Sequence, residues 1–577
     1  MSHKNRQPSL QSLQTDSFDV VIVGGGISGA WIARLCSASG LKTALVERGD
    51  FGSETSSASS KLLHGGIRYL QQLQFGKVRE SSLERAHYLY AAPHLASSVP
   101  FVVPTYRDLK RSKWLLRGAL TAYDLLGMGQ GSIAESRDRL KLQIDNFSAS
   151  ELNGICDLAH LDHTGALAFP EWHMYDSERT VWAIIESAQH SGAVVANYLN
   201  ATRLLIEEGK TTGLIVSDME TGQQFDISSR LVVNAAGPWV DFLNEEITAH
   251  KQPHNHQALI QNYAAGAHII TRQLTGEHAI AINTKHKSAT RIDRGGRHIF
   301  IIPWRGYSLI GTSYRETEDP DSTRYLGTED LNQLLDAVNE TLPSVRLSSK
   351  DIISAYIGLY PLRTNKQLKA TYQGSGEYTI VDHEIEHGIS NLVTALGAKY
   401  TTGRILAEKT LKLLLKKIPE SSSTANQPLK LKLQCAQYED LSEFSRESHE
   451  KLSDRFTSEQ INHLIQTYGS DLDSFVDYIE KQNTGSDVRN PIVDGQPDIQ
   501  GQIPWAVERE MSIHLDDVLY RRTSVGLLGI SETELTHVAN QMSRLLDWSE
   551  EQRQREIKSV IERQSSFRNL LQSYYDE

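Results

Sequence analysis

The stretch FDVVIVGGGISGAWIARLCSASGLKTALVER, residues 18–48, decides the fold of this chain. It begins with an apolar, β-branched run at residues 19–23, which is typical of a strand buried on both faces of a parallel sheet. A glycine-rich turn follows, and then helix-forming residues from 30 to 39 with Gly40 as a C-cap. A second apolar run at residues 41–46 completes the pattern. These features predict one β-α-β unit of about thirty residues.

The spacing Gly24-x-Gly26-x-x-Gly29 between strand and helix indicates a dinucleotide site. The first glycine makes a tight turn, the second lets backbone approach a pyrophosphate, and the third lets helix and sheet pack closely. Glu47, 18 residues after Gly29, ends the second strand, where a carboxylate can accept both ribose hydroxyls and repels a 2′-phosphate. The motif therefore argues against NADP but does not decide between FAD and NAD. Its predicted cofactor-binding residues are Gly24, Gly25, Gly26, Ile27, Ser28, Gly29 and Glu47.

The composition sets limits on the class of protein. The chain has 577 residues, 59 Lys+Arg against 71 Asp+Glu, a net charge of −12 and 39% hydrophobic residues. This is typical of a globular protein and argues against a nucleic-acid binder, while a local basic pocket for a phosphorylated substrate stays open. Three widely spaced cysteines form neither a disulfide framework nor a zinc motif and indicate a reducing, cytoplasmic compartment. No run of eighteen apolar residues predicts a membrane span.

The rest of the chain alternates strand-like and helix-like runs. Strands are predicted at 230–236 and on both sides of the turn PWRG at 303–306, and a helix at 407–418. PESSSTANQP, residues 419–428, has the composition of a linker. Beyond it, TSEQ at 457–460 and SETE at 531–534 fit helix capping boxes. The second precedes an apolar stripe that predicts the core of an all-α domain, namely Leu535, Val538, Ala539, Met542, Leu545 and Leu546.

A second stretch, SSASSKLLHGGIRYL at residues 56–70, helps to decide between FAD and NAD. Here the chain resembles the FAD-dependent glycerol-3-phosphate dehydrogenases. The resemblance continues in that family's order through APHL at 92–95, NAAGPWV at 234–240, IPW at 302–304, IGT at 310–312, GAKYTT at 397–402 and DDVLYRRT at 516–523. It covers nearly the whole chain after residue 16, which makes it far more specific than any single motif.

The resemblance implies an α/β fold, α+β overall, with a Rossmann-like FAD domain of the D-amino-acid-oxidase type. That FAD domain is expected to be discontinuous, with a mixed-sheet substrate cap and an all-α C-terminal domain. The expected boundaries are a flexible tail at 1–15, FAD segments at about 16–90, 180–245 and 355–418, cap segments at about 91–179 and 246–354, a linker at 419–430 and helices at 431–577.

The resemblance also implies which residues bind FAD and substrate. On the flavin side it suggests Ser60, Lys61, Leu63, Gly65 and Gly66; on the adenine or pyrophosphate side Ala236 and Gly237; over the ring Gly358, Gly397 and Thr401. The catalytic candidates are His64, Lys399 and Arg68. The substrate-binding candidates are Arg68, Tyr69, Tyr360, Arg363 and Lys399.

In this family a secondary alcohol gives its C–H hydride to flavin N5 while a side chain takes or stabilises the hydroxyl proton. A histidine suits that role because its ordinary pKa is about 6.5. His64 is therefore the expected base or polariser, the alternative being that it only binds the cofactor. Arg68 is suited to an anionic group through its planar fork, the alternative being a structural ion pair.

The sequence departs from the family where the substrate phosphate binds. Tyr360 stands in place of the arginine of the G-x-R-P-L loop, and Gly376 in place of an arginine before the D-Y-T strand. Leu35 and Ala398 also depart from the pattern. Two lost hydrogen bonds to a charged group amount to roughly 3–6 kcal/mol, or about 10² to 10⁴ in binding, which is enough to change the preferred substrate. Arg363 could replace the missing arginine only if its loop bends.

The motif HEIEH at residues 383–387 matches the zinc-peptidase pattern, which requires a helix. It follows a strand-like run and meets Gly388 after one turn's length, so a solvated hairpin without metal is expected.

Three functions follow as hypotheses. The first is oxidation of sn-glycerol 3-phosphate to dihydroxyacetone phosphate, with electrons passing to a quinone. Contact with the inner face of the cytoplasmic membrane would then be peripheral, through residues 114–120 or 407–418. The second keeps FAD and changes the substrate to another hydroxy acid, polyol derivative or amine, and the third is a non-catalytic FAD-binding scaffold. Oxygen as acceptor, covalent attachment of FAD and a homodimer stay open.

Overall fold

The computed structural model describes residues 6–66, 74–134, 140, 142–156, 158, 162–249, 258–283, 298–318, 320, 326–362, 378–397, 399–419, 430–481 and 488–576. The chain forms two compact units, each assembled from separate segments. The first comprises Met1–Ser57, Asp176–Gln261 and Gly376–Ser565, and the second Ala58–Tyr175, Asn262–Ser375 and Ser566–Glu577. The helices after residue 430 thus group with the first unit as far as Ser565.

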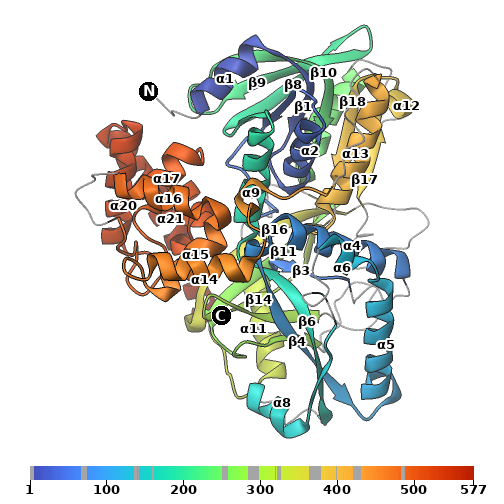
Figure 1. Cartoon of the computed structure of the whole chain (residues 1–577), viewed down its shortest axis with the longest axis vertical. Helices are drawn as coiled ribbons and strands as arrows, with labels where there is room; N and C mark the ends of the chain where they lie inside the picture. The colour runs from blue at the N-terminus through green and yellow to red at the C-terminus, as the bar shows by residue number, and fades with distance from the viewer. Residues whose placement is uncertain are drawn as a thin grey trace. The chain divides into compact units, whose positions relative to one another are not determined.

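An eight-stranded sheet, counted over the described residues, forms the centre of the first unit (Figure 1). Its strands are β1 (Ser17–Val23), β2 (Thr43–Val46), β7 (Val194–Ala196), β8 (Leu199–Glu207), β9 (Lys210–Asp218), β10 (Gln224–Asn234), β17 (Thr379–Asp382) and β18 (Leu392–Leu396). The order is β17-β18-β10-β1-β2-β7, with β9 paired to β10 and β8 to β9. From β18 to β7 every pairing is parallel, as the buried apolar strand at residues 19–23 predicts.

Three helices pack against one another beside this sheet: α2 (Ile27–Ala38), α9 (Ser177–His190) and α13 (Gly403–Lys417). The predicted helix after the glycine turn is confirmed as α2, and Gly40 ends it in the left-handed conformation at φ +82°. The predicted helix at 407–418 is confirmed as part of α13, which buries Leu406, Ala407, Leu411 and Leu414. Its neighbour α2 is almost entirely buried, as expected of a helix that packs on both α9 and α13.

The N-terminal segment corrects a prediction. Residues 6–15, expected to be a flexible tail, form helix α1 (Arg6–Thr15). Leu10 and Leu13 are buried in the core of the first unit, and the buried Arg6 donates to Asp218 Oδ1 at 2.6 Å. Arg6 also donates to the carbonyls of Asn197 and Tyr198. The polar composition does not reveal this helix, because two leucines and one arginine make these contacts with distant parts of the chain.

The C-terminal part of the first unit is helical, as predicted. Its main helices are α14 (Leu441–Leu452), α15 (Ser458–Tyr468), α16 (Leu472–Lys481), α17 (Gln502–Arg509), α18 (Leu515–Asp517), α20 (Glu532–Leu546) and the part of α21 (Glu550–Asp576) that ends at Ser565. Both predicted capping boxes are confirmed, at Thr457 with Gln460 and at Ser531 with Glu534. The apolar stripe of α20 is core rather than a binding surface, since all of its members except Leu545 are buried.

The second unit is built on a ten-stranded mixed sheet, again counted over the described residues. Its strands are β3 (Leu62–Leu63), β4 (Ala96–Tyr106), β5 (Asp145–Phe147), β6 (His163–Met174), β11 (Asn262–Arg272), β12 (Ala279–Asn283), β13 (His298–Trp304), β14 (Tyr307–Gly311), β15 (Arg315–Thr317) and β16 (Ile352–Leu362). The predicted strand–turn–strand around PWRG is confirmed as β13 and β14, joined by Arg305 and Gly306 at φ +52° and +77°.

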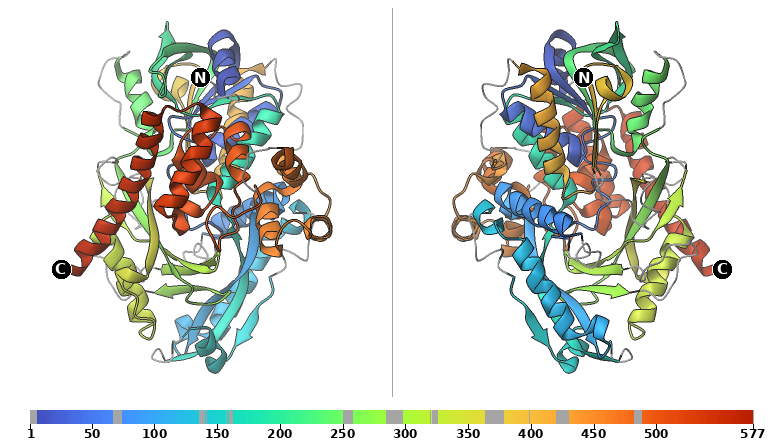
Figure 2. Two further views of the ribbon diagram at one scale, coloured as in Figure 1. Left: turned by 90° about the vertical axis from the view of Figure 1, so that its left-hand side faces the viewer. Right: turned by 90° about the vertical axis from the view of Figure 1, so that its right-hand side faces the viewer.

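Helices pack against this sheet in two places. Leu331, Leu334 and Val338 of α11 (Thr328–Thr341) pack into its main apolar core. Figure 2 (right) shows α5 (Lys113–Leu126) lying over β4 and β6, and α4 (Phe75–Ala91) packs against α5. The two units thus have separate sheets, which agrees with the expected FAD domain and mixed-sheet cap, while the boundaries given from the sequence stay predictions.

Candidate cofactor and substrate site

The glycine turn of the first unit connects β1 to α2, and the Ile27 amide at the start of the helix donates to the hydroxyl of Ser56 at 3.0 Å. Gly24 has φ +103°, and a Cβ there would lie 2.6 Å from the carbonyl oxygen of Ala235. A Cβ at Gly29 would lie 1.8 Å from the carbonyl oxygen of Gly24. Gly26 is the N-cap of α2 and contributes no side-chain cap. The backbone amides of the first turn are therefore presented as an anion site of the kind that holds a pyrophosphate.

Glu47, at the end of β2, braces this turn. Its Oε2 accepts from the Gly25 amide at 2.6 Å, and its Oε1 accepts from the Gly49 amide at 2.8 Å. Partial burial raises the pKa of Glu47 above its usual value, although both amide hydrogen bonds act in the opposite direction. The carboxylate is half-buried and keeps lone pairs for ribose hydroxyls, so its chemistry fits the predicted role.

Three parallel strands bring the other predicted residues of the first unit to the same edge of the sheet. Ala236 and Gly237 follow β10, and Gly397 follows β18. The Ala235 amide donates to the carbonyl of Val23 at 2.9 Å, which ties the loop after β10 to the end of β1. A Cβ at Gly397 would lie 2.6 Å from the hydroxyl of Ser28. Small residues and open backbone thus meet beyond the carboxyl ends of the strands, where nucleotides bind in open α/β sheets.

In the second unit the segment around Lys61 is buried. Lys61 is fully buried with φ +55°, and its carbonyl accepts from the Met174 amide at 2.6 Å. Its ammonium lies 5.6 Å from the ring centre of Trp304. Burial, together with the charge of Lys61, lowers the pKa of both His173 and His268 to about 3, so both imidazoles are neutral. A buried lysine that lowers the pKa of two buried histidines is an arrangement typical of a functional site.

His268 is a candidate that the sequence reasoning missed. It lies on β11, is buried, and its Nε2 is 2.9 Å from the hydroxyl of Ser60. Tyr356 stacks on its ring at a centroid distance of 5.2 Å. Nδ1 of His268 is buried without a hydrogen-bond partner among the described residues. The only signal in the sequence is a histidine inside the apolar strand AAGAHII, residues 264–270, which is more often a core residue.

The predicted residues Gly358 and Tyr360 lie on the same face of β16 as Tyr356, because side chains alternate along a strand. A Cβ at Gly358 would meet the Cβ of Ala58 at 2.7 Å, and the Tyr356 hydroxyl donates to the carbonyl of Ser59 at 2.8 Å. Segment 58–60 therefore lies against this face. Tyr360 stands one pleat repeat, about 7 Å, beyond Gly358, so an altered residue there lies next to the segment that the resemblance assigns to the flavin.

His64 has a defined tautomer. The Gly66 amide donates to its Nδ1 at 3.2 Å. A neutral imidazole that accepts at Nδ1 carries its hydrogen on Nε2. His64 thus presents a donor rather than a lone pair at Nε2, which favours a polarising role over that of a base.

A buried network holds the loop that follows His64. The Gly65 amide donates to Oε2 of Glu171 at 3.2 Å, and Arg85 donates to the same oxygen at 2.8 Å. The Tyr123 hydroxyl donates to Oε1 of Glu171 at 2.9 Å. Burial acts to lower the pKa of Arg85, but Tyr123 and Glu171 outweigh it and raise that pKa, so the guanidinium keeps its charge. The sequence reasoning missed this network, whose members are far apart in the chain.

Several predicted residues lie outside the described residues or are placed only in part. Arg68, Tyr69, Arg363, Gly376 and Ala398 lie outside the described residues. Lys399 and Thr401 belong to the first unit, where Lys399 is half-buried and its carbonyl accepts from the hydroxyl of Thr402 at 3.3 Å. His64 belongs to the second unit.

The prediction of a solvated hairpin at HEIEH is wrong. These residues form the one-turn helix α12 (His383–His387), because Asp382 caps it by accepting from the Glu384 amide and Gly388 ends it at φ +66°. Nδ1 of His383 lies 3.0 Å from Nδ1 of His387, and its Nε2 lies 2.8 Å from the hydroxyl of Thr394. Within the described parts of the chain, no group of three or more His, Cys, Asp or Glu side chains could hold a metal ion.

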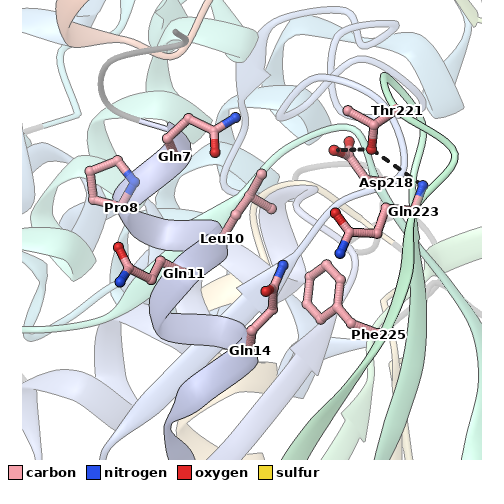
Figure 3. A pocket seen from close by; sticks show the side chains of 9 residues that line it. All are labelled: Gln7, Pro8, Leu10, Gln11, Gln14, Asp218, Thr221, Gln223 and Phe225. Atoms are coloured by element: carbon pink, nitrogen blue, oxygen red, sulfur yellow. Dashed lines mark hydrogen bonds between the residues drawn. The ribbon is translucent and has the colours of Figure 1, made fainter. Parts of the chain in front are cut away.

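A polar groove of about 550 Å³ lies elsewhere in the first unit, between α1 and the hairpin of β9 and β10 (Figure 3). Its lining residues are Gln7, Pro8, Leu10, Gln11, Gln14, Asp218, Thr221, Gln223 and Phe225. None of them belongs to the predicted site, and the four amide side chains offer no cationic group for a phosphate.

Comparison with known proteins adds the family relationship. Residues 19–408 match the family of FAD dependent oxidoreductases, and residues 427–553 match the C-terminal domain of alpha-glycerophosphate oxidase. A glycerol-3-phosphate dehydrogenase of Synechocystis sp. is 28% identical over 573 residues, covering 95% of this chain and 97% of that protein. The mitochondrial glycerol-3-phosphate dehydrogenase of Mus musculus is 29% identical over 583 residues, covering 96% of this chain and 74% of that protein.

A solved structure supports the fold. The glycerol-3-phosphate dehydrogenase from Bacillus halodurans, complexed with FAD, superposes with a TM-score of 0.71 at 24% identity, covering 97% of each chain. The similarity extends over both units and the C-terminal helices.

Proposed function

Because the chain belongs to the FAD dependent oxidoreductase family, we propose that it oxidises sn-glycerol 3-phosphate to dihydroxyacetone phosphate. The observation that carries this proposal is that relatives named glycerol-3-phosphate dehydrogenase align over 95% or more of the chain. The fold class, the FAD cofactor and the oxidoreductase class expected from the sequence are confirmed by the family match. Bound FAD supplies a two-electron acceptor for the carbon-bound hydride.

The residues of the first unit fit the nucleotide half of FAD. The first turn of α2 would face the pyrophosphate with the backbone amides that follow Ile27, whose own amide donates to Ser56. The glycines at 24, 26 and 29 leave no side chain in the way. Glu47 would accept the hydroxyls of the ribose. Ala236, Gly237, Gly397 and Thr401 would complete the same edge of the sheet.

The residues of the second unit would act on the substrate. His64 would donate its Nε2–H to the substrate oxygen, since Nδ1 is occupied by the Gly66 amide. Lys61 supplies a buried positive charge. The neutral His268 supplies a buried nitrogen that can accept a hydrogen bond from a hydroxyl, while its pKa of about 3 makes it a poor base. Lys399, which belongs to the first unit, stays a predicted ligand of the substrate oxygen or of a developing negative charge.

Anaerobic reduction tests the substrate. We expect millimolar sn-glycerol 3-phosphate to bleach the visible flavin absorbance of the purified holoenzyme within one turnover. The sn-1 enantiomer serves as the control, because a chiral site should discriminate against it. A flavin that stays oxidised with the correct enantiomer but is reduced by dithionite would rule out this substrate.

A different substrate is the second candidate, and Tyr360 is the observation that favours it. Tyrosine offers one hydroxyl where the family's arginine offers a planar, charged fork for phosphate. Unphosphorylated hydroxy acids, polyol derivatives and amines belong in the same bleaching assay. If Tyr360→Arg leaves the KM for glycerol 3-phosphate unchanged, the argument for an altered substrate loses its basis.

A quinone in the membrane is the proposed electron acceptor, and α5 is the proposed contact surface. None of the described helices is long and apolar enough to span a bilayer. On α5 and its flanks, however, Trp114 is 80% exposed and Leu109 84%, and Leu115, Leu125 and Met128 are more than half exposed. Arg107 and Arg117 are exposed beside them. Apolar side chains flanked by arginines suit an anionic lipid surface.

Helix α13 is the other candidate for the membrane contact. It is packed against α2, and its Lys412 and Lys417 form ion pairs, so it offers less free surface to lipid than α5 does.

Vesicle binding tests this surface. We expect Trp114→Ser with Leu115→Ser to weaken binding to phosphatidylglycerol vesicles about tenfold or more, because two apolar side chains no longer enter the lipid. Ile385→Ser is the matched control, since Ile385 is 78% exposed on α12. Flavin bleaching should be unaffected in both variants. Equal binding of all three proteins would remove α5 from the proposal.

A further inference from the structure

The motif DDVLYRRT, residues 516–523, contributes two buried arginines that meet a single buried carboxylate. Nε of Arg521 donates to Oδ2 of Asp50 at 2.5 Å. Arg522 donates to both oxygens of Asp50, at 2.8 Å and 3.0 Å. Arg522 also donates to the backbone carbonyl of Glu510 at 2.9 Å, so it connects Asp50 to the helical region. All of these groups belong to the first unit.

Asp50 is part of the loop that begins with Glu47. Within this loop the Gly49 amide donates to Oε1 of Glu47, and the Gly52 amide donates to the carbonyl of Gly25 at 3.0 Å. Glu47 in turn accepts from the Gly25 amide. The loop of residues 47–52 is thus hydrogen-bonded to the glycine turn at two points, and Asp50 is its anchor.

The anchor is ionic. Burial alone would raise the pKa of Asp50, but the charges of Arg522 and Arg521 outweigh it and lower that pKa to about 2. Asp517 also pairs with Arg521, and it accepts from the hydroxyl of Tyr198 at 2.5 Å. The Tyr198 amide donates to the carbonyl of Gly49 at 2.9 Å, which gives the motif a second connection to the same loop. The C-terminal motif therefore contacts residue 50 directly and reaches residue 49 through Tyr198.

We propose that Arg521 and Arg522 are positioning residues for FAD, holding the loop 47–52 so that Glu47 and the glycine turn keep the geometry that binds the nucleotide. The C-terminal helical region would then contribute to cofactor retention without touching the cofactor. This inference rests on the proposed role of Glu47 toward the ribose. It assigns a function to a motif that the proposed reaction does not otherwise use.

Hydrogen exchange of the unmodified protein is the first test. Coupling between two sites is reciprocal, so a motif that stabilises the FAD site must itself be stabilised by FAD. We expect exchange in peptides covering 47–52 and 516–523 to be slower in the holoenzyme than in the FAD-stripped full chain. Peptides from α14 and α15 serve as the control within the same helical region. Protection of 47–52 without protection of 516–523 would overturn the proposal.

Variants give the second test, with the FAD dissociation constant and the free energy of unfolding measured on each protein. We expect Arg522→Gln to weaken FAD binding about tenfold or more, and Arg522→Lys to restore part of the loss, because lysine keeps the charge but not the fork. Asp498→Asn is the matched control: it removes the buried pair of Asp498 with His463 at 3.0 Å but no partner of Asp50. If the Arg522→Gln protein binds FAD as tightly as the Asp498→Asn protein, the proposal is refuted.

The variant Glu47→Gln distinguishes the role of Glu47 toward the ribose from the positioning role of Arg521 and Arg522. If Glu47→Gln binds FAD as tightly as the unmodified chain, the role of Glu47 toward the ribose fails, and the proposed positioning by Arg521 and Arg522 fails with it. If Glu47→Gln weakens FAD binding and Arg522→Gln does not, only the positioning role fails. If both weaken it, the double variant should lose less than the product of the two single effects, because both act on one loop.

Discussion

Replacing His64 by Ala is expected to lower kcat about 10²- to 10³-fold while the FAD content stays at that of the unmodified enzyme. The reason is the hydrogen bond from the Gly66 amide to Nδ1, which leaves Nε2–H as the group that can face a substrate oxygen. Removing a donor that acts on developing charge costs about 3–4 kcal/mol in such sites. Single-turnover flavin reduction measures the effect, because it reports the chemical step rather than reoxidation by the acceptor.

The nature of the replacement distinguishes a donor from a base. Gln can place an amide N–H near the position of Nε2, whereas Asn can reach only the position of Nδ1. We therefore expect His64→Gln to recover part of the lost rate and His64→Asn to recover less. A histidine acting as base would also make the rate of flavin reduction fall below a pH of about 6.5, whereas a neutral donor would not. If both variants lose the same factor in the rate of flavin reduction, and this rate in the unmodified enzyme falls below a pH of about 6.5, His64 acts as a base.

The parts of the site that depend on local sequence could be predicted. The glycines at 24, 26 and 29 fall within six residues, and the carbonyl of Gly24 leaves no room for a Cβ at position 29 of the same turn. Glu47 follows from the length of one β-α-β unit. The capping boxes at Thr457 and Ser531 are equally local. In each case the physical cause lies within one element or one turn, so the sequence pattern contains it.

The parts that depend on tertiary contacts could not be predicted. Helix α1 is stable because Arg6 reaches Asp218, more than 200 residues away. His268 becomes a candidate only through Ser60 and Tyr356, which lie far from it in the sequence. The wrong prediction at HEIEH has a different cause. The strand before it suggested a hairpin, but Asp382 and Gly388 cap a helical turn, and both signals were present in the local sequence.

Glu171→Ala is expected to lower the free energy of unfolding by about 3–5 kcal/mol, because it leaves the charge of Arg85 buried without its carboxylate. Arg85 and Glu171 are both buried, and their ion pair is 2.8 Å long. Tyr123 loses its acceptor in the same variant. Chemical denaturation of the holoenzyme measures this effect, and Glu151→Ala, which removes an exposed helix cap in the same unit, is the control. A loss no larger than in the control would contradict a buried, charged pair.

The network of Arg85, Tyr123 and Glu171 also holds the loop next to His64 in place. Replacing all three residues by apolar ones separates this positioning role from their contribution to stability. Buried ion pairs are often replaced by well-packed apolar residues at little cost in stability, so the triple variant Arg85→Met, Tyr123→Phe, Glu171→Leu should unfold at nearly the same free energy as the unmodified protein. It nevertheless removes the acceptor of the Gly65 amide, next to His64. A loop fixed to within half an ångström is required for efficient transfer, so we expect flavin reduction to slow about tenfold or more despite restored stability. Recovery of both stability and rate would mean that Glu171 serves only to neutralise Arg85.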